Sequence, residues 1–222
     1  ILYNFPSNPT GATITVEQRD ELLAFAQRHD LWIITDEVYD RIVFDSEHVS
    51  FVGCDDDRVI LINSFSKTYA MTGWRIGYIL SANKEAMAQM IKVQYYITAC
   101  SNDAMQYAVL TAINEADHYP DEMCAEFKAR RDLICSRLNT MPGVQCHVPE
   151  GAFYVFPKVD VPGMTSEEVA IELLKGGVLC SPGSAFGPSG EGHLRFAYTI
   201  SREDISLGMD KTEQVLKRLR GD

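Results

Sequence analysis

Short apolar runs separated by polar turns make up most of the first part of the chain. The runs fall at residues 1–5, 31–34, 59–62 and 74–80, and runs of this length are typical of buried strands. Between the first two runs, Thr15 and Gln18 have the spacing of a capping box, and apolar positions at helical intervals continue towards His29. Strands that alternate with a helix in this way predict a largely parallel α/β sheet.

Helical periodicity takes over in the second part of the chain. The expected helices are residues 84–100, 102–115, 121–139, 165–175 and 201–219, and the expected short strands are 144–148, 152–156, 178–180 and 193–200. The helix at 121–139 is long and amphipathic, so it can bridge two domains. We therefore expect a large sheet domain over residues 1–125 and a small α+β domain over residues 126–222.

Composition narrows the class of protein. The 222 residues are 46% apolar and 23% charged, which is ordinary for a globular protein, and the net charge of −11 argues against a nucleic-acid partner. Six cysteines show no metal-binding spacing, so we expect no metal site and interpret them as reduced, mostly buried thiols of a cytoplasmic protein. No apolar run is long enough to span a membrane. The chain opens on an apolar segment without a methionine, so we expect it to be part of a longer protein.

Candidate chemistry is concentrated after the third apolar run. Ser64, Ser66 and Lys67 follow that run, and Arg75 comes eight residues after the lysine. Hydroxyl groups and an arginine fork suit a phosphate dianion, and a lysine fixed beside them can reach an aldehyde on the same molecule. Pyridoxal 5′-phosphate carries both groups and is held by a lysine as a Schiff base. The competing interpretation of Lys67 alone is a solvated surface charge.

Three apolar runs lead to side chains that suit such a cofactor, namely Asn8, Asp36 and Lys67. Ligands of parallel sheets bind beyond the carboxyl ends of the strands, so we expect these three side chains to converge. Asp36 would keep a pyridine nitrogen protonated, while Tyr39 and Asn8 would hydrogen-bond the phenolic oxygen of the ring. Taken singly, each residue has a simpler explanation: Asp36 and Asn8 as turn residues and Tyr39 as a packing residue.

Arg195 interrupts an apolar strand between Leu194 and Phe196. A buried arginine needs a partner, and the α-carboxylate of a substrate would match its fork with two hydrogen bonds. An internal salt bridge to one of the many acidic residues explains the arginine equally well, so both interpretations stay open. His193, on the same strand, receives no role.

Five motifs occur in an order and spacing that resemble a known family. They are Asn8-Pro9-Thr10-Gly11, Asp36-Glu37-Val38-Tyr39, the segment from Ser64 to Tyr78, Gly151-Ala152-Phe153-Tyr154 and Leu194-Arg195-Phe196. Together they resemble the class I/II pyridoxal-phosphate-dependent aminotransferases, the aspartate aminotransferase superfamily. The resemblance implies the fold type I architecture, in which a large cofactor-binding domain with a mostly parallel sheet is followed by a small α+β C-terminal domain. It also implies a homodimer.

The resemblance assigns a role to each candidate residue. Lys67, Asp36 and Tyr39 would be catalytic, with Lys67 carrying the cofactor. Besides these three, the implied cofactor-binding residues are Asn8, Ser64, Ser66 and Arg75. Asn8 and Arg195 would also contact the substrates, an amino acid and a 2-oxo acid.

The resemblance covers only about the C-terminal half of a family member. An early glycine-rich turn, the aromatic residue that stacks on the ring and several strands would be missing, so we expect the chain by itself to be inactive or nearly inactive. Transfer of an amino group between an amino acid and a 2-oxo acid is the leading hypothesis. Two other functions stay open on the same scaffold: a carbon–sulfur β-lyase, and a non-catalytic cofactor-binding effector domain of a transcription regulator.

Overall fold

The computed structural model describes residues 1–54 and 56–221, and these residues form two compact units. Unit 1 consists of Ile1–Pro6 and Thr13–Cys124, and unit 2 consists of Ser7–Ala12 and the chain from Ala125 onward. Helix α5 (Tyr119–Thr140) begins in unit 1 and continues into unit 2. The roles expected for the two parts, cofactor binding and a small C-terminal domain, stay predictions.

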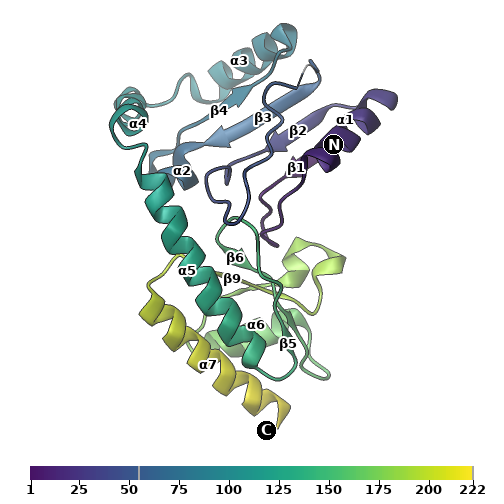
Figure 1. The fold of residues 1–222 in the computed structure, drawn as a ribbon, viewed down its shortest axis with the longest axis vertical. Coiled ribbons are helices and arrows are strands. Elements are labelled where there is room, and N and C mark those ends of the chain that lie inside the picture. The colour runs from purple at the N-terminus through teal and green to yellow at the C-terminus, as the bar shows by residue number, and fades with distance from the viewer. Residues whose placement is uncertain (55, 222) are drawn as a thin grey trace. The chain divides into compact units, whose positions relative to one another are not determined.

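A four-stranded sheet forms the centre of unit 1 (Figure 1). Its strands, in order across the sheet, are β1 (Leu2–Asn4), β2 (Ile33–Asp36), β3 (Val59–Ser64) and β4 (Gly77–Leu80). The first three are parallel, and Asn4, Asp36 and Ile62 lie abreast. β4 runs antiparallel to β3 and begins where Gly77 pairs with Ser64. Three strands therefore end at the edge where the fourth begins, and the mostly parallel sheet agrees with the expected fold class.

Helix α1 (Val16–Arg28) packs on the strands of unit 1 and closes a core with them. Its predicted capping box is confirmed, because the Thr15 hydroxyl accepts the Gln18 N–H and the Gln18 side chain accepts the Thr15 N–H. β2 begins later than expected, because the Leu31 N–H bonds back to the Ala26 carbonyl at 2.9 Å and belongs to the end of the helix. The buried core of this region consists of Ala26, Ile33, Phe51 and Val59.

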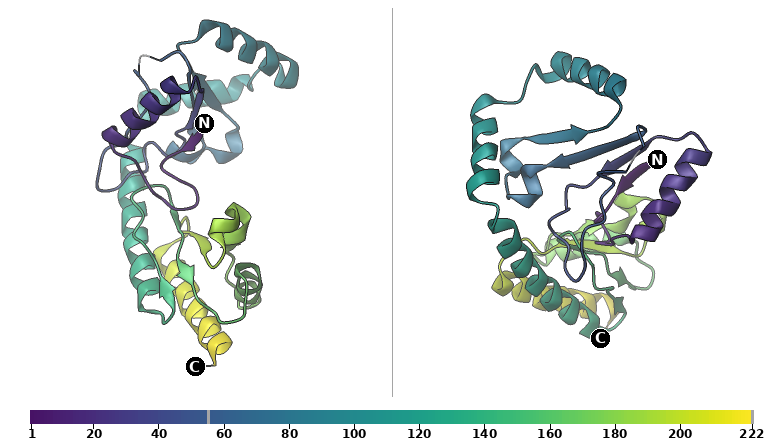
Figure 2. Two further views of the ribbon diagram at one scale, coloured as in Figure 1. Left: turned by 90° about the vertical axis from the view of Figure 1, so that its right-hand side faces the viewer. Right: turned by 45° about the horizontal axis from the view of Figure 1, so that its top comes forward.

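The other helices of unit 1 contribute little to its core. A short helix, α2 (Phe65–Thr68), and a 3-10 turn, η1 (Thr72–Trp74), connect β3 to β4. Helices α3 (Lys84–Thr98) and α4 (Asp103–Glu115) follow, and both can be traced in the two views of Figure 2. No described residue of α3 is buried, and Val109 is the buried residue of α4. These helices and β4 expose apolar side chains instead.

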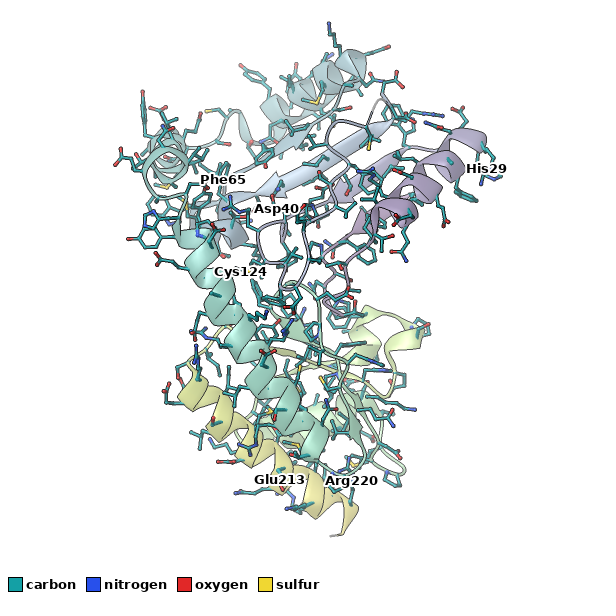
Figure 3. The ribbon with its side chains drawn as sticks, in the orientation of Figure 1. His29, Asp40, Phe65, Cys124, Glu213 and Arg220 are labelled. Carbon is teal, nitrogen blue, oxygen red and sulfur yellow. The ribbon has the colours of Figure 1, made fainter. Side chains whose placement is uncertain are left out.

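Unit 2 combines three helices with short antiparallel strands. The helices are the later part of α5, α6 (Ser166–Lys175) and α7 (Arg202–Arg220), which carries Glu213 and Arg220 in Figure 3. The strands are β5 (Val144–Gln145), β6 (Tyr154–Val155), β7 (Lys158–Val159), β8 (Ser181–Pro182) and β9 (Leu194–Ala197), paired as β5–β7 and β6–β9–β8. Two 3-10 turns, η2 (Gly183–Phe186) and η3 (Pro188–Gly190), lie between β8 and β9. Its nearly fully buried leucines are Leu138, Leu173, Leu194 and Leu216.

Two strand predictions in unit 2 are wrong in position. The run at residues 178–180 is not a strand, because the Val178 N–H bonds to the Leu173 carbonyl at 2.9 Å and continues the end of α6. The strand expected over residues 144–148 already ends at Gln145. Beyond it, the Cys146 N–H donates to the side chain of Asn139 at 2.9 Å rather than to a neighbouring strand.

All six cysteines are free thiols. The expectation that most are buried is wrong, because only Cys135 and Cys146 are buried and Cys100 is exposed. Within the described residues, no helix is long and apolar enough to cross a membrane. The same residues contain no group of three or more side chains that could hold a metal ion.

Candidate active site

The strand ends of unit 1 bring several candidate residues to one edge of the sheet. Asp36 is the last residue of β2 and Ser64 is the last residue of β3. Because Asp36 pairs with Ile62, the two strand ends are neighbours. Lys67 follows within α2, and Arg75 lies just before the start of β4 at the same edge. The strand register therefore gathers a carboxylate, hydroxyls, an amine and a guanidinium.

Short-range hydrogen bonds hold the segment around Lys67. Ser64 caps α2, and its hydroxyl accepts the N–H of Ser66 at 3.0 Å. The Ser64 N–H donates to the side-chain oxygen of Asn63 at 2.6 Å. Ser64, Ser66 and Lys67 are all partly exposed, so solvent reaches this turn within unit 1.

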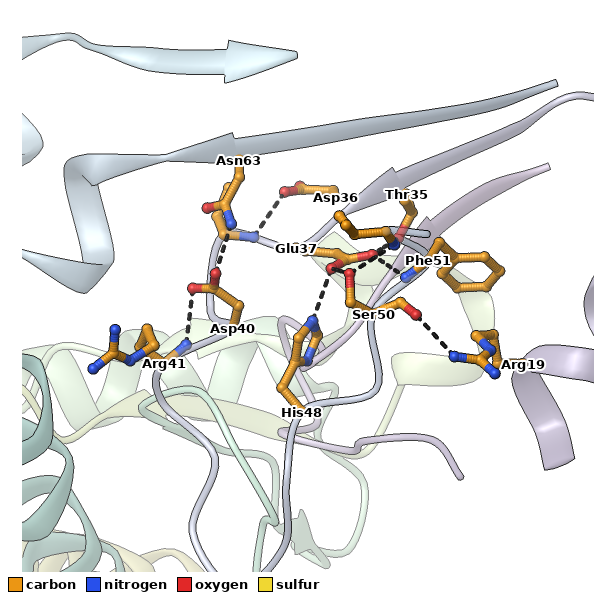
Figure 4. A network of polar contacts seen from close by, with 12 residues as sticks. Arg19, Thr35, Asp36, Glu37, Asp40, Arg41, His48, Ser50, Phe51 and Asn63 are labelled. Atoms are coloured by element: carbon orange, nitrogen blue, oxygen red, sulfur yellow. Dashed lines mark hydrogen bonds and ion pairs between the residues drawn. The ribbon is translucent and has the colours of Figure 1, made fainter. Parts of the chain in front are cut away.

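Asp40 binds the segment around Lys67 by hydrogen bonds to a residue before the lysine and to a residue after it. Its carboxylate accepts a hydrogen bond from Asn63 Nδ2 at 2.8 Å and another from the Thr68 hydroxyl at 3.2 Å, and the contact with Asn63 is visible in Figure 4. Asp40 directly follows Tyr39, which is buried. The turn that carries Tyr39 is thus tied to the turn that carries Lys67. The predicted contact of the Tyr39 hydroxyl with a cofactor stays a prediction.

A second group of polar contacts joins the same two turns to the first turn of α5 and the residues just before it. The Tyr69 hydroxyl donates to Asp117 at 2.7 Å. Arg41 forms ion pairs with Asp117 at 3.2 Å and with Asp121 at 2.9 Å. Exposed ion pairs contribute little to stability, so their main effect is to fix where the turns lie against the helix. Nothing in the sequence pattern pointed to these residues.

Backbone strain marks the end of the lysine segment. Ala70 and Arg75 have left-handed φ angles of 54° and 58°, which cost a residue with a side chain about 1–2 kcal/mol. The Arg75 guanidinium is exposed and donates to the Thr72 carbonyl at 2.7 Å. A Cβ on Gly77 would lie 2.6 Å from the Asn63 carbonyl oxygen, so only glycine lets β4 approach β3 here. Strain of this kind is frequent at functional sites.

Asp36 is a poorly satisfied carboxylate. Its Oδ1 accepts the Val38 N–H at 3.4 Å, and Asn4 donates to its backbone carbonyl at 3.1 Å. Burial raises the pKa of Asp36, and the charge of Glu37 raises it further. The contacts with Val38 and Asn4 lower the pKa but only partly oppose this rise. Among the described residues, no cation pairs with this carboxylate.

Glu37, the next residue, lies in the opposite environment (Figure 4). It is 2% exposed and accepts hydrogen bonds from Thr35 Oγ1 at 3.1 Å, Ser50 Oγ at 2.7 Å and the Phe51 N–H at 3.0 Å. His48 Nε2 lies 2.8 Å from Glu37 Oε2, the oxygen that also accepts the Ser50 hydroxyl. Burial raises the pKa of Glu37, but the hydrogen bonds from His48, Phe51 and Ser50 outweigh burial and hold the pKa below its ordinary value. Glu37 therefore fastens the irregular segment after β2 to the sheet.

We expected Asn8 to follow the end of a strand. It does not follow one directly, because β1 already ends at Asn4. It belongs to a turn in unit 2. The carbonyl of Gly11 in this turn accepts the Gly151 N–H at 2.8 Å. Gly11 has a φ of +69°, and a Cβ there would lie 2.3 Å from Pro149 Cβ. The first and fourth sequence motifs thus pack directly on each other.

Arg195 on β9 lies in unit 2 together with Asn8. Its Nη1 donates to Asn8 Oδ1 at 2.8 Å, and its Nη2 donates to the Ser181 hydroxyl at 3.0 Å. Its Cζ lies 4.6 Å from the ring centre of Tyr154 and 5.0 Å from that of Phe186, within cation–π range. Its Nε is buried without a hydrogen-bond partner. The internal salt bridge that the sequence left open is not formed with any described acidic residue.

Comparison with known proteins decides the family. The profile of the family described as aminotransferase class I and II matches residues 1–211. The chain belongs to the class I and II aminotransferases. It is 41% identical to a probable aspartate aminotransferase of Methanocaldococcus jannaschii, over 98% of this chain and 58% of that protein. It is 40% identical to aromatic-amino-acid aminotransferase 2 of Thermococcus litoralis, over 98% of this chain and 57% of that protein. The chain thus spans between half and two thirds of the length of these aminotransferases.

Solved aminotransferase structures share the fold. An aromatic aminotransferase from Pyrococcus horikoshii matches with a TM-score of 0.93 at 39% identity, covering 98% of this chain and 59% of that chain. The aspartate aminotransferase of Thermus thermophilus with maleate matches with a TM-score of 0.90 at 32% identity, covering 96% of this chain and 56% of that chain. The expected family and fold type are confirmed.

Aminotransferases of this family depend on pyridoxal phosphate, and the described residues fit that cofactor. Asp36 has a raised pKa and no cation partner, and a protonated pyridine nitrogen would supply the missing positive charge. Ser64, Ser66 and Arg75 place hydroxyl and guanidinium donors, which suit a phosphate, at the same sheet edge. Lys67 lies between these groups in the sequence, on α2.

Proposed function

We propose that the protein containing this chain is a pyridoxal-phosphate-dependent aminotransferase that transfers an amino group between an amino acid and a 2-oxo acid. The observation that carries the proposal is the strand register of unit 1, which brings Asp36, Lys67 and Arg75 to one edge. Relatives named as aspartate and aromatic aminotransferases support the same reaction.

Four side chains would act on the ring and the reacting atoms. The cofactor supplies an electron-withdrawing ring, which lets a proton leave the substrate Cα. The Asp36 carboxylate keeps the ring nitrogen protonated, and that pairing relieves the carboxylate's own desolvation. The Tyr39 hydroxyl and the Asn8 amide hold the phenolic oxygen. The Lys67 amine binds the cofactor and later takes the Cα proton as a general base.

Two further groups would bind and orient. Ser64, Ser66 and Arg75 hold the phosphate, and Arg195 holds the α-carboxylate of the substrate. The unpartnered Nε of Arg195 supports this role, because a carboxylate accepts from Nε and a terminal nitrogen together. The face of the guanidinium lies on Tyr154, which restricts how it can rotate.

Replacing Lys67 tests the proposal. We expect Lys67→Ala to lower the rate of amino transfer at least ~10²-fold, the lower end of the range for a general base, and to abolish the visible absorbance of bound cofactor. Lys158→Ala is the matched control, because Lys158 is exposed on β7. A panel of amino acids should show transfer that depends on a 2-oxo acid. Release of pyruvate and ammonia without that dependence would instead identify a β-lyase, and full transfer by Lys67→Ala would overturn the proposal.

The carboxylate role of Arg195 has its own test. We expect Arg195→Lys to raise KM for amino acids by about 10–100-fold, because a lysine is a point charge and cannot bind a carboxylate with two parallel hydrogen bonds. The turnover number should change much less than KM. An unchanged KM with a reduced turnover number would contradict the assignment.

We also propose that the protein works as a homodimer in the cytoplasm. Exposed apolar side chains on β4, α3 and α4 support association, and Leu80, Tyr96 and Leu110 are 47%, 78% and 54% exposed. Six free thiols support a reducing compartment. Sedimentation across a range of concentrations tests the dimer, and cell fractionation tests the compartment.

A further inference from the structure

Two buried thiols that take no part in the proposed reaction are in contact within unit 2. Cys135 lies on α5, and Cys146 directly follows β5. Their Sγ atoms are 3.8 Å apart, and the two residues are 3% and 7% exposed. A disulfide bond is about 2.05 Å long, so the sulfurs would need to approach by less than about 2 Å to bond.

We propose that Cys135 and Cys146 form a reversible thiol-oxidation site, which a peroxide closes to an intramolecular disulfide. The backbone around the pair is already arranged for this. Asn139, one turn after Cys135 on α5, donates from Nδ2 to the Cys146 carbonyl at 2.9 Å and accepts the Cys146 N–H at 2.9 Å. Both polar backbone groups of Cys146 are therefore fixed to the helix that carries its partner. Little chain entropy remains to be lost when the bond forms.

The two thiols have different roles in the reaction. Cys146 Sγ donates its hydrogen to Cys135 Sγ, and this contact lowers the pKa of Cys135. The charge of Arg131, one helical turn earlier, also lowers the pKa of Cys135, whereas burial raises it. The same contact and burial raise the pKa of Cys146. Because the thiolate is the nucleophile, Cys135 is the attacking cysteine and Cys146 is the resolving cysteine.

With hydrogen peroxide as oxidant, the reaction balances in two steps. The Cys135 thiolate attacks one peroxide oxygen, the O–O bond breaks, and hydroxide leaves. Cys135 becomes a sulfenic acid. The hydroxide takes up the proton that Cys135 had lost and becomes water. The Cys146 sulfur then attacks the Cys135 sulfur, the S–O bond breaks, and the Cys146 proton leaves with the hydroxyl group as water. Two thiols and one peroxide thus give one disulfide and two waters. A dithiol reductant reverses the bond by exchange.

Peptide mapping of the protein after graded peroxide treatment tests the site. We expect a linked peptide pair containing Cys135 and Cys146, with a mass loss of two hydrogen atoms, while the protein remains folded by circular dichroism. Thiol titration should show two of the six thiols lost, and dithiothreitol should restore both.

Single substitutions separate the pair from the other cysteines. Cys100→Ser removes an exposed thiol and should leave formation of the linked peptide unchanged. Cys135→Ser and Cys146→Ser should each abolish it, and Cys146→Ser should retain a sulfenic acid at Cys135 that a dimedone probe labels. If the linked peptide forms only in denaturant, or if peroxide oxidises Cys100 while both members of the pair remain free thiols, the proposal is wrong. Because mapping uses the unaltered protein, this outcome does not depend on whether the variants fold.

Discussion

Two neighbouring acids at the end of β2 have opposite environments. Glu37 is buried, accepts hydrogen bonds from side chains and backbone, and has a lowered pKa. Asp36 is only partly buried, accepts a long hydrogen bond from the Val38 N–H at 3.4 Å, and has a raised pKa. Successive residues of a strand point to opposite faces. The Glu37 carboxylate therefore stabilises the fold, whereas the Asp36 carboxylate, one residue earlier, needs a cation. The comparison shows that the supply of donors, more than burial, distinguishes the two.

The largest effect is expected from removing Glu37. Glu37→Ala leaves His48, Ser50 and the buried Phe51 N–H without their acceptor, so we expect the free energy of unfolding of unit 1 to fall by about 3 kcal/mol or more. Urea titration followed by tryptophan fluorescence measures this, because Trp32 and Trp74 both lie in unit 1.

The control for this variant is Glu47→Ala, which removes an exposed acid from the same segment and should change stability by less than about 0.5 kcal/mol. The loss in Glu37→Ala should also depend on pH. The folded-state pKa of Glu37 is lowered, so its contribution is full above the unfolded-state value of about 4.3 and is lost as pH falls through the folded-state value. A difference between wild type and variant that stays constant down to pH 2 would contradict the assignment.

Asp40, a third acid just beyond β2, should have the next largest effect. Asp40→Ala leaves both the Asn63 amide and the Thr68 hydroxyl without the carboxylate that accepts their hydrogen bonds. Asn63 is only 5% exposed. We expect a loss of about 2 kcal/mol in the free energy of unfolding, the cost of leaving a buried donor unpaired. The same variant should bind cofactor more weakly, because the Lys67 turn loses its attachment on both sides. Normal cofactor affinity in a destabilised variant would show that Asp40 supports the fold alone.

The elements that local signals specify were predictable from the sequence. Thr15 caps its helix with the expected reciprocal hydrogen bonds, and Thr165 caps the helix expected over residues 165–175 in the same way. The apolar run before Ser64 is β3. The edge that gathers Asp36 and Lys67 followed from parallel strands alone. The network around Glu37 was not predictable, because three of its partners come from the chain 11 to 14 positions away through an irregular segment.

Two of the two-residue strands of unit 2, β7 and β8, also escaped prediction. A strand as short as β8 (Ser181–Pro182) has no periodicity to detect, and the apolar run before it continues the end of α6. The packing of Asn8 against Arg195 joins residues 187 positions apart. Only the assembled unit reveals such a contact, although the sequence identified both residues as candidates.

Ser50→Ala sharpens the comparison by removing one donor from Glu37 and leaving the others. The Ser50 hydroxyl donates at 2.7 Å, so we expect a loss of about 1 kcal/mol in the free energy of unfolding. His48→Ala combined with Ser50→Ala should cost more than the sum of the two single losses, because Glu37 Oε2 would then have neither of these two partners. Strict additivity in this double-mutant cycle would indicate that the donors act independently.

The smallest expected effect has the opposite sign. The folded-state pKa of Asp36 is raised, so its ionised form is disfavoured in the folded state, and the penalty develops as pH rises above the unfolded-state value of about 3.9. Asp36→Asn removes that charge, and we expect the free energy of unfolding without cofactor to rise at pH 7, by less than about 1 kcal/mol since the carboxylate is only partly buried. The gain should vanish near pH 3, where wild-type Asp36 is protonated. Cofactor binding should weaken in the same variant, because asparagine offers the ring nitrogen no negative charge. A variant that loses stability at pH 7 would mean that Asp36, like Glu37, is a satisfied structural acid, and the contrast between the two would fail.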